Sequence, residues 1–335
     1  MTHDDKNLLL LSIIRQGKNT IITVDTDDRS FLAELIKNVN YLLSKKLENK
    51  PAFLCKKAGG ISQLIMSKKG TSFLDTLKLT YSLYYNKELR YQKLHPAIDV
   101  LLRIIDKYKM TNNSETSLLV DDKKSLSVLL NHAYNEFIRE INSKEYLKSQ
   151  RQFYQNANRI FSRSKKYVDN LFERYSKLLV IRIDLSYQTN KKHLITKNLL
   201  TEHQEKLYKA INQHPLFKQC VGYMIKLEYG RHKGFHYHTL FFFNGQKVFK
   251  DIIIGKMIGE YWGDIITEGY GLYFNCNYQK ERYRELGIGM INRKEQHLRT
   301  GLIKTIHYLC KVDKNIKIVI PGLKRTFWRG AIKAH

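Results

Sequence analysis

The pattern of hydrophobic and polar positions divides the chain into a helical first part and a second part in which strands alternate with helices. Apolar residues recur at helical spacing throughout the first part. The segments with this spacing are residues 31–47, 72–85, 98–108 and a long stretch over 124–175 that breaks near Asn142. We therefore expect residues 1–150 to form an all-α region, whose role the sequence leaves open.

From residue 177 onwards, short runs rich in β-branched and aromatic residues are typical of strands. Strands are predicted over residues 178–185, 221–229, 235–243, 271–277 and 288–292, and helices over residues 196–213, 248–265 and 295–311. Of the 18 glycines, 14 lie from Gly222 onwards, as expected where turns connect strands. These elements predict one α+β sandwich, and we place its domain at residues 151–335.

The charge of the chain points to a polyanionic partner. Lys and Arg number 58 against 31 Asp and Glu, which gives a formal net charge of +27. Residues 279–335 alone carry 14 basic and 4 acidic residues. A basic protein with solvated lysines is the alternative, but self-repulsion on this scale favours a nucleic-acid partner.

Cysteine use and hydropathy predict a cytoplasmic protein without a membrane partner. The four cysteines are scattered and none forms a CxxC pair, which fits a reducing compartment. The first residues lack the features of a signal peptide, because Asp4 and Asp5 lie where such a segment is positively charged. No apolar run approaches the ~20 residues of a membrane span.

A His-x-His motif in the third predicted strand is the strongest candidate for a metal site. His236 and His238 project from one face of the strand because side chains alternate along it. The preceding strand places Glu228 on one face, and the turn over residues 230–234 should bring it beside the histidines. Two imidazoles and a carboxylate leave positions open for oxygen ligands, which suits Mg²⁺ or Mn²⁺. A purely structural histidine pair, with Glu228 in a surface salt bridge, is the alternative.

Two further patterns are candidates for chemistry or DNA contact. Arg182 and Asp184 share one face of the first strand, which is either functional or simply solvated, and we assign both to DNA contact. In the last helix, Tyr308 and Lys311 are three residues apart and share a face. A tyrosine, with a pKa of roughly 10, needs a metal-bound phosphate and a nearby cation to act as a nucleophile. With 22 tyrosines in the chain, a packing role for Tyr308 is the alternative.

These motifs, in this order along the chain, resemble those of HUH replication initiators. The surrounding sequence is similar to the C-terminal domain shared by YagK/YfjJ proteins and the filamentous-phage (inovirus) replication initiators, over about residues 150–335. The matching pieces are Arg182-Ile183-Asp184-Leu185, Gly234-Phe235-His236-Tyr237-His238, Tyr308-Leu309-Cys310-Lys311 and Lys324-Arg325-Thr326-Phe327.

The resemblance implies a five-stranded antiparallel sheet flanked by helices. It also implies that Tyr308 cleaves single-stranded origin DNA, leaving a 5′-phosphotyrosyl link and a 3′-hydroxyl that primes rolling-circle synthesis for a phage, prophage or other mobile element. Some initiators carry a second tyrosine one turn earlier. That position is Lys304 here, so we expect a single-tyrosine enzyme in which Lys304 contacts DNA.

The basic C-terminal segment, residues 324–329, is a further candidate for DNA contact. Lys324, Arg325 and Arg329 would meet phosphates, and Phe327 and Trp328 would stack on unpaired bases. The alternative is that Trp328 packs on the domain and leaves the cations solvated.

Two other functions remain open on the sequence. The chain could be a non-enzymatic DNA-binding regulator, or an HUH transposase or relaxase, although relaxases often place the tyrosine before the histidine pair. No P-loop motif is present, so a replication initiator would depend on a host helicase and host replication machinery as partners. The oligomeric state is left open.

Overall fold

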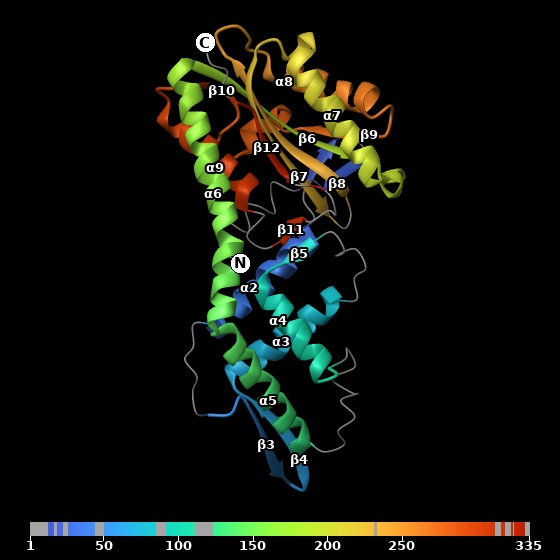
Figure 1. The fold of residues 1–335 in the computed structure, drawn as a ribbon, viewed down its shortest axis with the longest axis vertical. Helices are drawn as coiled ribbons and strands as arrows, with labels where there is room; N and C mark the ends of the chain where they lie inside the picture. The colour runs from blue at the N-terminus through green and yellow to red at the C-terminus, as the bar shows by residue number, and fades with distance from the viewer. Residues whose placement is uncertain are drawn as a thin grey trace. The chain divides into compact units, whose positions relative to one another are not determined.

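The computed structural model describes residues 13–16, 19–22, 26–43, 50–84, 92–110, 123–230, 233–311, 316–318, 323 and 325–331. The chain divides into two compact units (Figure 1). The first, called the helical unit, comprises residues 29–156 and 313–317. The second, called the sheet unit, comprises residues 1–28, 157–312 and 318–335, and includes the small hairpin of β1 (Ile13–Gln16) and β2 (Asn19–Ile22).

The helical unit confirms the helices predicted for the first 150 residues. They are α2 (Thr26–Leu43), α3 (Lys68–Tyr84), α4 (Pro96–Lys107), α5 (Lys123–Ile141) and the first part of α6 (Lys144–Arg174). Between α2 and α3 lies a hairpin that the apolar spacing did not indicate, formed by β3 (Phe53–Ala58) and β4 (Ile61–Met66). A short β5 (Gln92–Leu94) pairs with β11 (Ile316–Ile318). The fully buried side chains of the helical unit include Phe53, Phe73 and Phe137.

His95 makes the stability of the helical unit sensitive to pH. It caps α4 by accepting a hydrogen bond from the Ala97 amide at Nδ1 (3.3 Å), while Nε2 lies 2.9 Å from the Tyr154 hydroxyl. Burial lowers the pKa of His95 to about 4, because a charged imidazole would lose its hydration there. The unfolded chain has the ordinary value near 6.5, so it takes up the proton first as the pH falls.

We therefore expect the free energy of unfolding to fall by up to about 3 kcal/mol between pH 6.5 and pH 4. Urea denaturation over this range measures the effect. His95→Gln should flatten the dependence, whereas His132→Gln, which alters an exposed histidine of α5, should leave it unchanged. The same slope in wild type and His95→Gln would contradict the assignment.

The sheet unit is built on an antiparallel sheet that has six strands among the described residues, which corrects the expected five. All five predicted strands are present, as β6 (Lys177–Tyr187), β7 (Cys220–Gly230), β8 (Gly234–Asn244), β9 (Gly271–Asn275) and β10 (Gly289–Asn292). The sixth, β12 (Phe327–Arg329), comes from the basic C-terminal segment and pairs with β7. The order is β10-β6-β8-β7-β12, and β9 also pairs with β6.

One side chain bridges the gap between β9 and β10, which share an edge of β6. Asn277 follows β9, and its Oδ1 accepts a hydrogen bond from the Arg182 amide at 2.8 Å. Its Nδ2 donates to the Val180 carbonyl at 2.9 Å. The amide of Asn277 therefore takes the place of a paired strand at this point of β6, because buried backbone groups need partners.

Helices cover both faces of the sheet. On one face, α6 and α9 (Gln296–Lys311) pack on apolar side chains that include Val180, Met224 and Leu240. On the other, Tyr237 contacts α7 (Lys197–Gln213), and its ring lies 5.7 Å from that of Trp262. Thr196 caps α7 by accepting a hydrogen bond from the Leu199 amide. The helix predicted over residues 248–265 is α8 (Asp251–Glu260), which continues as the π-helix Tyr261–Ile266.

Short 3₁₀ helices complete the sheet unit at Lys192–Leu194, Pro215–Phe217 and Cys276–Arg282. Within the described part of the chain, no helix combines the length and the apolar character that crossing a bilayer requires. Because side chains alternate along β8, His236 and His238 face away from Tyr237. They therefore lie on the side of the sheet that α6 and α9 cover.

Candidate active site

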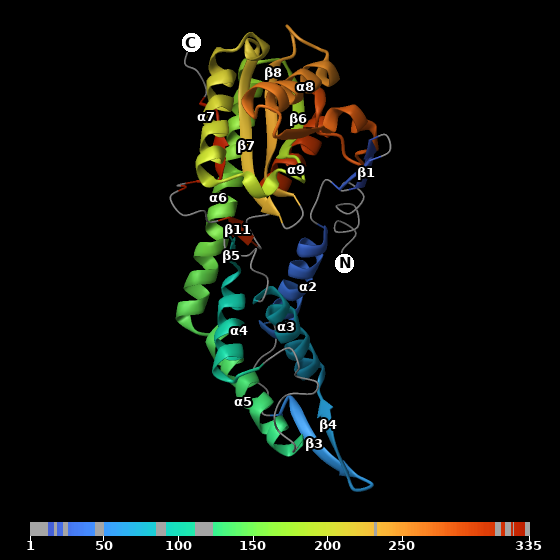
Figure 2. The ribbon, with the colours of Figure 1, turned by 90° about the vertical axis from the view of Figure 1, so that its right-hand side faces the viewer.

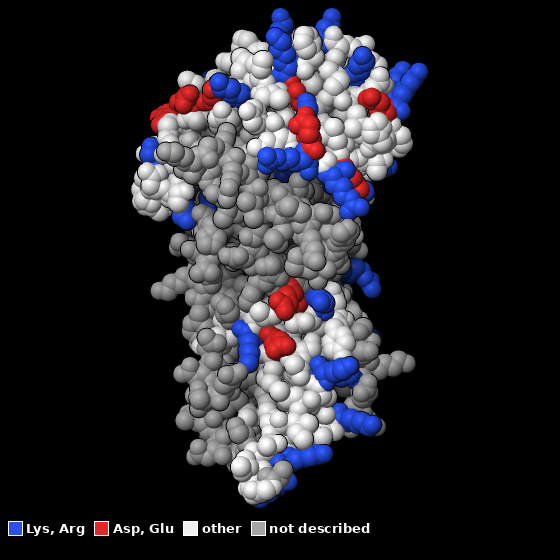
Figure 3. Space-filling view, turned by 180° about the vertical axis from the view of Figure 1, so that it is seen from behind, with Lys and Arg blue, Asp and Glu red and all other residues white. Residues whose placement is uncertain are grey.

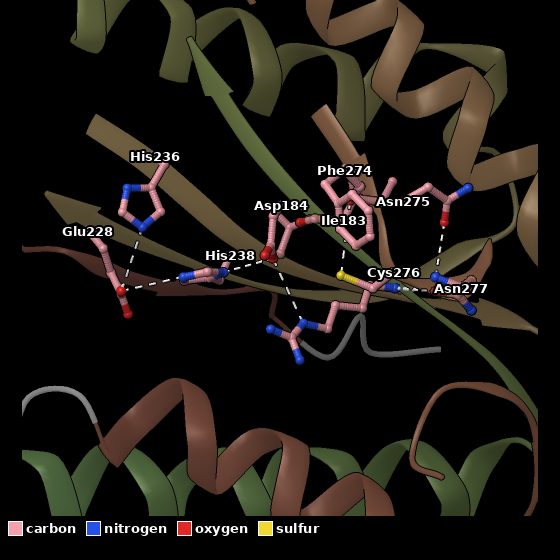
Figure 4. Close-up of polar contacts among 11 residues, drawn as sticks. Ile183, Asp184, Glu228, His236, His238, Phe274, Asn275, Cys276 and Asn277 are labelled. Atoms are coloured by element: carbon pink, nitrogen blue, oxygen red, sulfur yellow. Dashed lines mark hydrogen bonds and ion pairs between the residues drawn. The ribbon is translucent and has the colours of Figure 1, made fainter. Parts of the chain in front are cut away.

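The strand register brings Glu228, His236 and His238 together on one face of the sheet (Figure 4). Glu228 on β7 lies opposite His236 on β8, and His238 lies opposite Asp184 on β6. All three candidate ligands are buried, and Glu228 is only 3% exposed. The alternative of a surface salt bridge for Glu228 is therefore wrong.

The three side chains could hold a metal ion. Glu228 Oε2 lies 3.7 Å from His236 Nε2 and 3.4 Å from His238 Nε2, and one ligand atom from each residue falls within 4.8 Å of the others. His238 Nε2 is buried and has no hydrogen-bond partner among the residues that the structure describes. A buried polar atom of this kind calls for a ligand, and a carboxylate with two imidazole nitrogens suits a divalent cation.

Both imidazoles are held so that their Nε2 atoms turn towards Glu228. His236 Nδ1 lies 3.0 Å from the carbonyl oxygen of Gly234, the first residue of β8. Gly234 has a φ of +66°, which glycine adopts without strain. Burial, together with the positive charges of His238 and Lys233, lowers the pKa of His236 to about 3. His236 is therefore neutral, with a lone pair available to a metal.

Asp184 contacts His238 at Nδ1, the ring nitrogen that does not face Glu228. Its Oδ1 lies 2.7 Å from His238 Nδ1. Burial alone lowers the pKa of His238, but the carboxylates of Asp184 and Glu228 outweigh it and raise that pKa above its usual value. Likewise, burial alone raises the pKa of Asp184, but the charges of His238 and Arg182 bring it well below its usual value. This arrangement corrects our assignment of Asp184 to DNA contact, since its carboxylate is buried behind a candidate metal ligand.

Asp184→Asn should weaken Mn²⁺ binding by about 10- to 100-fold, because it removes the acceptor that fixes the imidazole of His238. Titration calorimetry with Mn²⁺ measures the affinity. Asp169→Asn is the matched control, because Asp169 forms ion pairs with Arg299 and Lys165 in the same unit. Equal Mn²⁺ affinities for the two variants would exclude the orienting role of Asp184.

Helix α9 places Tyr308 beside this group. The centroid of its half-buried ring lies 6.5 Å from that of His238. The guanidinium of Arg182 lies 5.3 Å from the centroid of the same ring. Arg182 is itself buried, and its Nε lies 3.8 Å from Asp184 Oδ1. The structure thus brings the candidate nucleophile, the candidate metal ligands and a buried cation into one place.

Two predicted site residues lie outside what the structure describes. Lys311 is the last residue of α9, and its side chain is not among the described ones; Lys324 is also outside them. Lys304, one turn before Tyr308, is exposed and pairs with Glu285 at 2.5 Å. Its assignment to DNA contact stays a prediction.

The basic C-terminal segment is tied to the sheet through β12. Trp328 is 6% exposed, and its ring lies 6.2 Å from that of Tyr208. Its proposed stacking on bases is therefore corrected, because the ring already packs in the domain. Phe327 is half-buried, whereas Arg325 and Arg329 are exposed. The guanidinium of Arg329 lies 5.0 Å from the ring of Tyr167. DNA contact by these three residues stays a prediction.

Comparison with known proteins gives one result that bears on this site. The family model of the YagK/YfjJ C-terminal domain matches residues 137–320, which is more than half of the 335 residues. No curated protein and no solved structure matches the chain. The matched region contains Glu228, His236, His238 and Tyr308. The chain therefore belongs to the YagK/YfjJ C-terminal domain family.

Proposed function

We propose that the sheet unit is an HUH-type domain that nicks and rejoins single-stranded DNA in the rolling-circle replication initiator of a phage, prophage or other mobile element. The placement of Tyr308 beside the buried Glu228, His236 and His238 carries the proposal. A nucleophile that attacks a phosphodiester needs the phosphate charge neutralised next to it. A divalent cation on these three ligands, Mg²⁺ or Mn²⁺, would supply that neutralisation as a Lewis acid.

The proposed chemistry exchanges one ester for another. The Tyr308 Oη attacks the scissile phosphorus, and the bond from phosphorus to the 3′ oxygen breaks. The phenolic proton is given up and a proton is returned to the leaving 3′ oxygen, so the products are a 5′-phosphotyrosyl link and a 3′-hydroxyl. Attack by a 3′-hydroxyl on that link restores the phosphodiester, and no external energy source is required.

The residues around Tyr308 have distinct tasks in this scheme. Asp184 and the Gly234 carbonyl orient the two imidazoles. Arg182 packs on the Tyr308 ring and brings a permanent positive charge next to the reacting groups. Because Lys304 occupies the position one turn earlier, α9 offers a single tyrosine at this site. A second strand transfer then requires another copy of the chain, another nucleophile or water.

The charge of the chain supports a DNA substrate. A net charge of +27 favours binding to phosphate backbones, and Figure 3 shows Lys and Arg side chains on the described surfaces of both units. We expect strand separation to be carried out by a host helicase working with host replication machinery.

The polarity of a covalent adduct tests the proposal. Single strands that tile the replicon encoding the chain are incubated with the purified protein and Mn²⁺, labelled at either the 3′ or the 5′ end. We expect the 3′ label to migrate with the protein and the 5′ label to appear in a shorter free strand. EDTA should abolish both products.

Other outcomes would reject the proposal in distinguishable ways. Cleavage without an adduct indicates a hydrolytic nuclease, and an adduct that carries the 5′ label indicates the opposite polarity. Binding without cleavage in any tiled strand supports the alternative of a non-enzymatic DNA-binding regulator.

A further inference from the structure

The β3–β4 hairpin projects from the end of the helical unit (Figure 2), and none of the six residues of β4 is buried. Its strands pair in register from Phe53 opposite Met66 to Ala58 opposite Ile61. At the tip, Gly59 and Gly60 have φ values of +57° and +80°, and a Cβ on either would meet nothing within 4 Å. The hairpin therefore ends in a narrow turn with open space around it.

The base of the hairpin is held by helix α5. Asn131 on α5 donates a hydrogen bond to the Phe53 carbonyl at 2.7 Å and accepts one from the Phe53 amide at 3.1 Å. Phe53 is buried, and Cys55 and Leu64 on the same face of the hairpin are half-buried. One face is thus anchored to the unit, which fixes the direction in which the hairpin projects.

The opposite face is exposed and carries no acidic residue. It presents, in alternation along the two strands, Leu54, Lys56, Ile61, Gln63 and Ile65. Ile61, next to the tip, is 67% exposed. Large aliphatic side chains held in water next to lysines are typical of a surface that binds a partner.

The positive charge of the hairpin indicates a negatively charged partner. Residues 50–70 contain five lysines and no Asp or Glu. Lys56 and Lys57 are exposed near the tip, and Lys68 is exposed at the start of α3, whose first turn holds no acidic residue. Positive charge at both ends of the ribbon fits a partner with closely spaced negative charges, as a phosphate backbone has.

The dimensions of the hairpin fit a groove of duplex DNA. Six residues at ~3.3 Å each make a ribbon about 20 Å long, with its strands ~4.8 Å apart. The major groove of B-DNA is about 12 Å wide and admits a two-stranded ribbon. Inside it, the aliphatic side chains can contact thymine methyl groups while the lysines meet phosphates.

We propose that the β3–β4 hairpin inserts into the major groove of duplex DNA, so that the helical unit is a double-strand DNA-binding module. This role is carried by a different unit from the proposed nicking site, and it does not depend on that proposal.

Salt dependence of duplex binding tests the inference. The full chain is titrated, in EDTA to suppress nicking, into a fluorescent 30-base-pair duplex of mixed sequence at several KCl concentrations. Lys56→Gln/Lys57→Gln should lower the slope of log K against log[salt] by about 2, because each phosphate contact contributes ~0.9. Lys144→Gln/Lys148→Gln is the matched control, because it removes the same charge from exposed positions on α6 and should leave the slope unchanged.

A second variant separates groove contact from charge. Ile61→Ser should weaken duplex binding by about fivefold without changing the salt slope, because it removes apolar contact alone. The major groove of A-form RNA is too narrow for side chains to enter. Affinity for an RNA duplex should therefore be the same in Ile61→Ser and wild type.

Three results would overturn the inference. The first is an equal loss of slope in the hairpin variant and its control, and the second is duplex binding that neither hairpin variant alters. The third is a hairpin variant whose mass in sedimentation differs from that of wild type when no DNA is present, which would indicate a protein interface. Circular dichroism verifies that each variant is folded. Lys56→Gln/Lys57→Gln should cleave short single strands at the wild-type rate. Failure of the nicking proposal can therefore be distinguished from failure of the duplex-binding inference.

Discussion

Replacement of Tyr308 by phenylalanine should abolish the covalent protein–DNA adduct while Mn²⁺ binding and the fold are retained. The change removes only the hydroxyl that the proposed reaction uses. The ring keeps its contacts with His238, 6.5 Å away, and Arg182, 5.3 Å away, so packing is preserved. Loss of a nucleophile typically costs more than about 10⁴-fold in rate, which places the adduct below detection on a denaturing gel.

A matched control for this variant is Tyr278→Phe, since Tyr278 is exposed and lies in the same unit. It should form the adduct at the wild-type rate. Tyr283 is the alternative nucleophile to exclude, because it is a second tyrosine near Arg182. An adduct that persists in Tyr308→Phe and disappears in Tyr283→Phe would reassign the reaction.

The double substitution His236→Ala/His238→Ala should eliminate both metal binding and nicking. It leaves Glu228 as the one remaining ligand of the three, which is too few for a stable divalent site. Binding of a ligand to the folded state alone stabilises it by about 2.7 kcal/mol when the ligand is present at 100 times its dissociation constant. Wild type should show this gain with Mn²⁺ in urea denaturation, and the double variant should show none.

This measurement does not depend on activity, so it tests the metal site by itself. His203→Ala is the control, because His203 is a buried histidine of the same unit whose ring packs against Tyr187 and Trp262 instead. His203→Ala should keep the Mn²⁺-dependent increase in the free energy of unfolding, even if the variant is less stable than wild type without metal. A gain that survives in the double variant would mean that the metal binds elsewhere.

Local patterns were enough to predict most of the sheet unit. The run from Leu178 to Leu185 is continuously buried, as its apolar composition indicates for a central strand. The two-residue spacing of His236 and His238 placed them on one face. The turn after Glu228 brought that carboxylate beside them, which the pairing of β7 with β8 confirms.

Long-range register could not be predicted in the same way. Alternation along the first strand put Arg182 and Asp184 on one face, but only the pairing of β6 with β8 sets Asp184 opposite His238. The partnership of Asn277 with Val180 spans 97 residues and has no signature in the local sequence. Trp328 was misassigned because a short, basic strand has the composition of a solvated tail.

The β3–β4 hairpin was missed although its signal is present. Gly59 and Gly60 form a two-residue turn between two apolar runs, which is a recognised hairpin pattern. The lysines Lys56 and Lys57 interrupt the first run and obscured it. In the structure these lysines remain in water, because only the base of the hairpin is covered by α5.

Strand β12 also bears on how this chain can be handled as a recombinant protein. It is three residues long, and its pairing with Met224–Lys226 covers that stretch of the β7 edge. Uncovered strand edges are templates on which other chains assemble into aggregates. Trimming the basic end before Phe327, as one would trim a disordered tail, would uncover this edge together with the surface on which Trp328 packs. Expression vectors should therefore carry the chain through Gly330.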